Sequence, residues 1–507
     1  MPAAAWAETL ADAVAAAYDR NPQLVQQRYL QKARDENYVQ ARSQYGPSVT
    51  VTTSGGYHYQ SLSGRSGDAD NQQTSLSISQ PLYTSGQIRG QVAAARAGVL
   101  GGQEQVRLAE QQIVQDVVLV YAGVLRDQAR VEIGRENVTV LEGQLRQNRK
   151  RQEIGDVTLT DVAQSDARLA AAELQLATLE ADLAISRGQY LEIVGHNPGV
   201  LEPLPQLGAL PRTIDMAFDL AEQNNPSFLI AQYVEQQSSA SAASTRGQQG
   251  PTLSVSAEGR YSNRLLNFGR DPGTKDFITG FTLTQPIFSG GAIRSRIREA
   301  DARNRADQAG IDVARRSALQ AVTSAWVQLS AARTAVVTGQ RQVDSAQQAF
   351  AGMSCEELNG LRATIETLNA EQELQSAQIQ LVENRYQVYV SHAQLLAAVG
   401  GLSAQAIADN IKVYDPEANF QRVRYRGVTP LDLVGMGLDR IGSAGPRGPY
   451  SPDLAGENVP TPETVPLAAA PGRELMNRPL TPMTQSQLRL PNGDSARCPL
   501  LGPRPRR

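Results

Sequence analysis

Two hydrophobic patterns divide the chain, and the first is strict alternation of apolar and polar residues. Alternation over short windows predicts strands with one apolar face. The windows occur in two pairs, at Ser48–Thr52 and Thr74–Ser79 and again at Thr252–Ser256 and Phe277–Thr284. Polar, glycine-containing links at Ser61–Gln73 and Asn263–Lys275 join the members of each pair and predict exposed loops. We therefore expect two strands in each half of the chain.

The second pattern is a seven-residue apolar period, which is typical of long packed helices. It runs through Val162–Tyr190 and through Leu374–Leu395. A heptad period keeps one seam of a helix against a partner helix and imposes a left-handed supercoil. No proline occurs in residues 82–197 or 287–415. Because proline breaks helix interiors, both stretches can hold helices longer than those of an ordinary globular domain.

A comparison of lengths predicts how these helices lie. At 1.5 Å per residue, a helix over Ser85–Gln152 spans roughly 100 Å. Helices over Leu159–Gly195 and Pro22–Tyr45 span about 55 Å and about 36 Å, and together they nearly match the long one. We therefore expect a long helix to run from the strands to a turn near Gly155, with two shorter helices stacked end to end beside it.

The chain repeats itself at an almost constant offset. Two residue pairs return 204 positions later, namely Asn21-Pro22 as Asn225-Pro226 and Gly46-Pro47 as Gly250-Pro251. Four more matches return 205 positions later, namely Gln80-Pro81 as Gln285-Pro286, Ile88-Arg89 as Ile293-Arg294, Gly155 as Gly360, and Val194-Gly195 as Val399-Gly400. This period is far longer than the 20 to 50 residues of solenoid repeats, so it indicates a duplicated unit of domain size.

The repeat and the proline content divide the chain into five parts. They are a signal-peptide remnant at 1–7, a first repeat at 8–212, a second repeat at 213–410, an extension at 411–442 that packs around the waist, and a proline-rich tail at 443–507 that is predicted to be disordered. The signal remnant rests on Ala5 and Ala7, which form a cleavage box, and an alanine-rich helix start is the alternative.

Composition and motifs exclude several function classes. Aromatic residues make up 5% of the chain, too few for a large compact core, and a net charge of -3 gives no footprint for nucleic acid. No run of 18 apolar residues exists. The sequence has no GxSxG, P-loop or HExxH motif, and His58, His196 and His392 match no metal-ligand spacing. We therefore expect no enzyme, no cofactor and no metal site.

Four motifs carry a resemblance to a known family. Gln80–Gly86 and Gln285–Gly291 resemble the strand-to-helix signature of the TolC family, with Pro81, Gly86, Pro286 and Gly291 as its turn residues. Gly155–Val162 and Gly360–Ala370 resemble the two helix-to-helix turns of that family. The match spans about residues 8–415. Independently, four strands are too few to close a membrane barrel, which needs about eight, so several copies have to share one.

The resemblance implies a mainly α protein with a membrane β-barrel. In this TolC-like channel-tunnel, a homotrimer shares a twelve-stranded barrel that continues into a periplasmic α-helical barrel. It implies a location in the outer membrane, in contact with its lipid, with a large periplasmic part. The implied partners are a periplasmic adaptor (membrane fusion) protein and an inner-membrane transporter. Leu368–Leu374 resembles the type I secretion branch, in which that transporter is an ABC transporter.

The resemblance also implies two kinds of functional residue at the far ends of the helices. Carried over by position, Asp161, Arg362, Glu366 and Asn369 form a periplasmic gate. A ring of three Glu366 carboxylates attracts cations, and Arg362 offers a donor fork for Asp161 on a neighbouring helix. Asn369 replaces a second acidic residue, and Gly352–Glu357 lacks the expected tyrosine. The turn residues Gly155, Thr158, Gly360 and Leu361 are the expected adaptor-docking tips.

The gate has one alternative interpretation, and the function of the whole chain has three. The gate residues can instead be solvated helix-end charges, with Asp161 stabilising the helix N-terminus. The chain can serve type I protein secretion, or a drug or metal efflux duct with a proton-driven RND pump. A soluble periplasmic coiled-coil scaffold is a third possibility, which the strand windows disfavour. The sequence does not predict the substrate.

Overall fold

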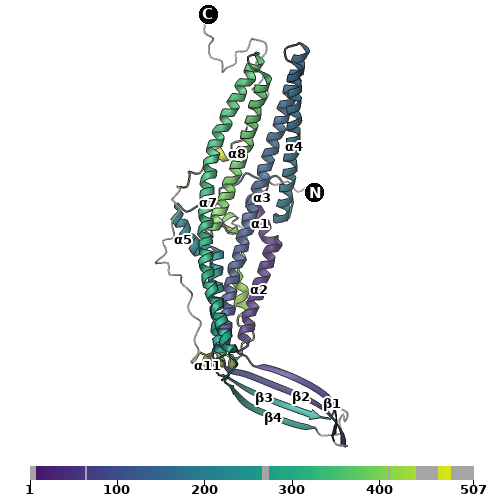
Figure 1. The fold of residues 1–507 in the computed structure, drawn as a ribbon, viewed down its shortest axis with the longest axis vertical. Helices are drawn as coiled ribbons and strands as arrows, with labels where there is room; N and C mark the ends of the chain where they lie inside the picture. Colours follow the sequence, from purple (N-terminus) through teal and green to yellow (C-terminus); the bar gives the residue numbers. More distant parts are fainter. Residues whose placement is uncertain (1–6, 63–64, 265–272, 409–410, 441–465, 481–507) are drawn as a thin grey trace.

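The computed structural model describes residues 7–62, 65–264, 273–408, 411–440 and 466–480. Figure 1 shows an elongated molecule, with long helices along most of its length and a four-stranded sheet at one end. Of the predicted signal remnant at 1–7, residues 1–6 lie outside the described residues.

The described part of the chain contains the same order of elements twice. The first set is α1 (Leu10–Arg20), α2 (Pro22–Ser43), β1 (Ser48–Leu62), β2 (Arg65–Tyr83), α3 (Gln87–Glu153) and α4 (Leu159–Val194). The second set is α5 (Ile214–Asn224), α6 (Pro226–Gly247), β3 (Thr252–Asn263), β4 (Thr274–Thr284), α7 (Ala292–Leu358) and α8 (Thr364–Ala398). Matching helices agree in length, since α1 and α5 have 11 residues, α2 and α6 have 22, and α3 and α7 have 67.

The two repeats carry matching local signals at the starts of their second helices, α2 and α6. Asn21 and Asn225 each accept a hydrogen bond from a backbone N–H two residues on, and a proline follows each at the first helical position. Both residue types favour a helix start there. The break between α1 and α2, and its copy between α5 and α6, are therefore encoded in an Asn-Pro pair.

The sheet has the strand order β1-β2-β3-β4, and every neighbouring pair is antiparallel. β1 and β4 are its edges, and neither has a partner on its outer side within the described residues. The first predicted loop is wrong in extent, because β1 and β2 stay paired as far as Leu62 and Arg65. Backbone hydrogen bonds form this ladder, so polar side chains do not end it. Of the second loop, residues 265–272 lie outside the described residues.

The helices pack as the length comparison predicts. α2 and α4 both lie along α3, one after the other, as Figure 1 shows. The heptad seam of α4 is buried in its lower part, at Leu183 and Tyr190, and that of α8 at Leu381 and Leu395. One core cluster joins α1, α3 and α4 and also includes Ala393 and Leu396 of α8, and a second joins α5, α7 and α8. The first core therefore also ties the end of α8 to the first hairpin.

The segment after α8 departs from two expectations. Its helices are α9 (Ala404–Ile407), α10 (Pro416–Val423), α11 (Pro430–Leu438) and α12 (Arg473–Asn477). α10 packs along α2, but α11 contacts β2 at the end of the sheet and not the waist (Figure 1). Residues 466–480 of the predicted disordered tail pack on the second core through Leu467, Met476 and Leu480, because these three apolar side chains find an apolar surface there. The rest of the tail lies outside the described residues.

Candidate functional site: hairpin tips and strand-to-helix junctions

The first hairpin tip is a tight turn between α3 and α4. Gly155 has φ 78°, a left-handed conformation that glycine adopts without strain. Thr158 then caps α4 in a capping box, in which its Oγ1 accepts from the Asp161 N–H at 3.2 Å and its own N–H donates to Asp161 Oδ2 at 2.9 Å. The carboxylate of Asp161 is therefore engaged in holding the start of its own helix.

The second tip uses the same turn with a different set of side chains. Gly360 has φ 69°, and the Leu361 N–H donates to the Glu356 carbonyl at 2.9 Å. Arg362 donates through Nε to Glu356 at 2.8 Å and through Nη1 to Glu366 at 2.7 Å. The hydrogen bonds that Arg362 donates to Glu356 and to Glu366, in this order of weight, raise the pKa of Arg362 above its ordinary value. Arg362 is therefore paired with acids of its own hairpin.

The four predicted gate residues do not form one cluster within a chain. Asp161 is bonded in the first tip, while Arg362 and Glu366 are bonded to each other in the second. Asn369 accepts from Nη2 of Arg168, on α4, at 3.0 Å. The predicted contact between Arg362 and Asp161 is not among the interactions of the described residues within one chain, and between copies it stays a prediction.

Contacts between the two hairpins near their tips were missed by the sequence analysis. Arg151 of α3 lies 3.7 Å from Glu357 of α7, and both side chains are largely buried. Arg168 of α4 donates to Gln372 of α8 at 2.5 Å. Glu357 belongs to the segment Gly352–Glu357, which lacks the tyrosine expected from the resemblance. A single sequence carries no signal that pairs an arginine with a glutamate about 200 residues away.

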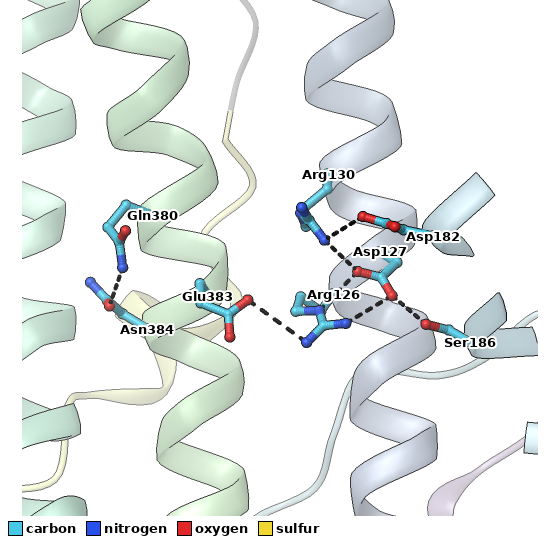
Figure 2. A network of polar contacts seen from close by, with 8 residues as sticks. All are labelled: Arg126, Asp127, Arg130, Asp182, Ser186, Gln380, Glu383 and Asn384. Atoms are coloured by element: carbon cyan, nitrogen blue, oxygen red, sulfur yellow. Dashed lines mark hydrogen bonds and ion pairs between the residues drawn. The ribbon is translucent and has the colours of Figure 1, made fainter. Parts of the chain in front are cut away.

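A further polar network joins α3 and α4 of the first hairpin to α8 of the second, farther from the tips (Figure 2). Asp127 of α3 is 1% exposed and accepts from Arg126, Arg130 and Ser186. Burial acts to raise the pKa of Asp127, but the hydrogen bonds from Arg126 and Ser186 outweigh it and lower that pKa. Arg126 also lies 3.8 Å from Glu383 of α8. This buried carboxylate holds the arginine that reaches the other hairpin.

The first strand-to-helix junction, Gln80–Gly86, is covered by the chain itself. Gly86 has φ 82° and precedes α3, as the sequence argument for a glycine expects. Asp439, fully buried after α11, accepts from the N–H groups of Thr84 at 2.8 Å and Gly86 at 3.0 Å. The Tyr45 hydroxyl donates to the same carboxylate at 3.1 Å. α11 and Asp439 therefore cap the N-terminus of α3.

The second junction, Gln285–Gly291, has the same backbone without that cover. Gly291 has φ 83°, and Gln285 donates to the Gln249 carbonyl at 2.9 Å as Gln80 does to the Tyr45 carbonyl at 2.7 Å. Ile287 is 94% exposed and Phe288 is 89% exposed. Pro81 and Pro286 occupy equivalent places in the two junctions. The second junction thus presents a bare apolar surface within one chain.

The described residues also bear on two other kinds of site, a membrane-spanning helix and a metal centre. Among the described residues, none of the helices has both the length and the apolar content to cross a membrane. The same residues contain no group of three or more His, Cys, Asp or Glu that could hold a metal ion.

Comparisons with known proteins identify the fold and the family. The model of the outer membrane efflux protein family matches residues 13–196 and 217–401, one match for each repeat. The outer membrane efflux protein BepC of Brucella suis is 29% identical over 83% of this chain and 91% of its own. The alkaline protease secretion protein AprF of Pseudomonas aeruginosa is 26% identical over 66% of this chain and 71% of its own.

A solved structure has the same fold. The CmeC outer membrane channel of Campylobacter jejuni superposes with a TM-score of 0.72 over 82% of this chain and 89% of its own, at 16% identity. The family predicted from the two pairs of motifs is therefore confirmed. This chain belongs to the outer membrane efflux protein family, and like its members it is an outer-membrane channel with a large periplasmic part and not an enzyme.

Proposed function

We propose that the chain assembles as a homotrimer in which each copy adds its four strands to a twelve-stranded barrel and its two hairpins to a periplasmic tunnel. One observation carries the proposal: a sheet open at both edges continues directly into two hairpins of matched length. Edge β4 exposes Phe277 and Phe281 at 77% each. Open edges and exposed aromatics are unfavourable in an isolated chain, whereas pairing β4 of one copy with β1 of the next satisfies the edges.

The proposed substrate class is a secreted protein, exported by a type I system with an ABC transporter and an adaptor. The resemblance at Leu368–Leu374 supports this choice, and so does the similarity to AprF, which is named for protease secretion. An efflux duct with a proton-driven pump is the second candidate, because BepC is named as an efflux protein. The soluble scaffold is set aside, since the family is one of outer-membrane proteins.

A gene deletion distinguishes the two candidates. For type I secretion, we expect the loss of one or a few proteins from the culture medium, with unchanged susceptibility to drugs and metals. The opposite pattern, a normal set of secreted proteins with raised susceptibility, would favour the efflux duct. A deletion strain that matches its parent in both assays contradicts the proposed export function.

We further propose a gate and docking surface at the tunnel tip. The gate consists of Asp161, Arg362, Glu366 and Asn369, with Arg362 of one copy facing Asp161 of the next. The turn residues Gly155, Thr158, Gly360 and Leu361 dock the adaptor. Their support is positional: all eight lie at or within a few turns of the two tips. Exposed ion pairs contribute only about 0–1 kcal/mol, but three copies act on one opening.

Single-channel conductance in planar bilayers tests the gate. Arg362→Ala and Asp161→Ala should each raise the conductance, and the double variant should add little because both changes remove one contact. Glu366→Gln should lower the cation preference by removing ring charge at nearly constant size. Leu374→Ala, on the heptad seam, is the control. Unchanged conductance in both the Arg362→Ala and the Asp161→Ala variant, with Leu374→Ala equally silent, contradicts this gate.

A further inference from the structure

A third, small core cluster holds the two hairpins together near their tips. It consists of Leu141 from α3, Ala172 from α4 and Leu368 from α8, each less than 9% exposed. The first of the two larger clusters also contains Ala393 and Leu396 of α8, but these lie near the end of α8 that is far from the tip. This cluster is therefore the apolar part of the contact that must separate if the hairpins move apart at the tip.

A carboxyl group lies in the middle of this contact. Glu371 follows Leu368 by three residues on α8, so both side chains lie on one face of the helix. Glu371 is 5% exposed and lines a cavity of about 90 Å³ together with Leu141, Arg168 and Ala172. Neither of its oxygens has a hydrogen-bond partner of ordinary geometry among the described residues. An ionised carboxylate is costly in such a place, while a neutral acid is tolerated.

The polar groups near Glu371 do not outweigh the burial of its carboxyl group. Gln144 of α3 is its polar neighbour, and the Gln144 Oε1 is buried without a partner in the described structure. The Gln144 amide can serve both forms of Glu371, since its oxygen accepts from a protonated Glu371 and its N–H donates to the carboxylate, which lowers the pKa of Glu371. The other charged residue lining the cavity is Arg168 of α4, which is already bonded to Asn369 and Gln372 on α8. The residues of α3 that line the cavity are Asn137 and Leu141, which are uncharged.

We propose that Glu371 is a proton-sensitive element of the tunnel tip, which lets the two hairpins pack together when neutral and drives them apart when ionised. The burial of Glu371 is complete within one chain, so assembly is not needed to create it. The consequence for export rests on the proposed function, since separation of the hairpins opens the duct only if the chain forms one.

The direction of the pH dependence follows from the two states. Burial raises the pKa of Glu371 from 4.5 to about 8 in the packed state, with Gln144 lowering it slightly. In separated hairpins the group is hydrated and its pKa returns toward 4.5. The packed contact is therefore strongest at acid pH, weakens as the pH rises from 4.5 to about 8, and changes little above that. Within this window the packing equilibrium shifts by up to about tenfold per pH unit.

Distances between the tips test this inference on the full-length protein in detergent. Spin labels at Leu159→Cys and Leu361→Cys, both exposed positions, report the separation of the hairpins by double electron–electron resonance. We expect a short distance at pH 5 and a growing longer-distance population up to pH 8. Glu371→Gln should keep the short distance throughout, because it mimics the neutral acid. Glu373→Gln is the matched control on an exposed neighbour and should respond like the unmodified chain.

The outcomes separate this inference from the proposed function. A tip distance that does not change with pH, or a pH response that persists in Glu371→Gln, overturns the inference even if the protein forms channels in bilayers. A pH-dependent distance in a protein that forms no channels supports the inference and contradicts the duct. If Glu371→Gln fails to assemble, infrared spectroscopy of the unmodified protein decides. The inference requires a protonated carboxyl band that persists at pH 7 and disappears above about pH 8.

Discussion

The two strand-to-helix junctions have the same backbone but different surroundings. Both turn at a left-handed glycine, and in both a glutamine binds the carbonyl that ends the preceding turn. At the first junction, Asp439 and α11 bury Gly86 and bind its N–H. At the second, Ile287 and Phe288 stand almost fully exposed. The chain's own C-terminal extension covers the first junction, whereas no described segment of the same chain covers Ile287 and Phe288 at the second.

The largest expected effect is at the exposed junction. Ile287→Ser combined with Phe288→Ser should abolish assembly, because covering two such side chains contributes about 4 kcal/mol per chain. The secondary structure of the unassembled chain, measured by circular dichroism, should not change. Ile287→Leu with Phe288→Leu is the matched control that keeps the apolar surface. Normal assembly of the serine variant would mean that no copy covers this junction.

At the covered junction, Asp439→Ala should act on the chain itself. It leaves the N–H groups of Thr84 and Gly86 and the Tyr45 hydroxyl without their buried acceptor, which costs about 3 kcal/mol. We expect a lower midpoint of urea unfolding. Glu417→Ala, on the exposed side of α10, is the control and should leave the midpoint in place. An equal midpoint for Asp439→Ala would show that the carboxylate does not stabilise the junction.

The fold was largely predictable because local patterns encode it. Alternation at Thr74–Ser79, the heptads of α4 and α8 and the repeated Asn-Pro pairs each act over a few residues. The side-chain contacts and the packing that the sequence did not predict depend on other parts of the folded chain. Within one chain Arg362 is bound by Glu356 and Glu366, and its contact with Asp161 of another copy stays a prediction. The burial of Glu371 depends on α3 and α4, which pack against α8 only in the folded chain. The packing of residues 466–480 required knowledge of the apolar surface on α7 and α8.

Gly86 and Gly291 have nearly the same backbone conformation, so substituting each one compares the surroundings of the two junctions. Valine in a left-handed conformation costs about 1–2 kcal/mol, so Gly86→Val and Gly291→Val should both reduce the yield of the assembled protein. The loss should be greater for Gly86→Val, since Gly86 is buried beside Asp439 whereas no atom lies within 4 Å of the Cβ position at Gly291. A wild-type yield from both variants would show that neither turn requires glycine.

The smallest effect is expected at the hydroxyl groups of the two junctions. Thr84→Ala removes a donor to Asp439 and should cost about 1 kcal/mol in urea unfolding. Ser289→Ala is its counterpart in the second repeat, where no carboxylate of the described chain binds the hydroxyl, and it should be close to neutral. Equal costs for the two variants would erase the difference between the junctions.

The mass of the purified protein in detergent, measured by native mass spectrometry, tests the central claim most directly. Because one chain supplies four strands with both edges open, we expect three copies of 54.6 kDa each, less any cleaved segment, with the full strand content by circular dichroism. A stable monomer with the same strand content would contradict the account, since its sheet edges and its second junction would then need no partner.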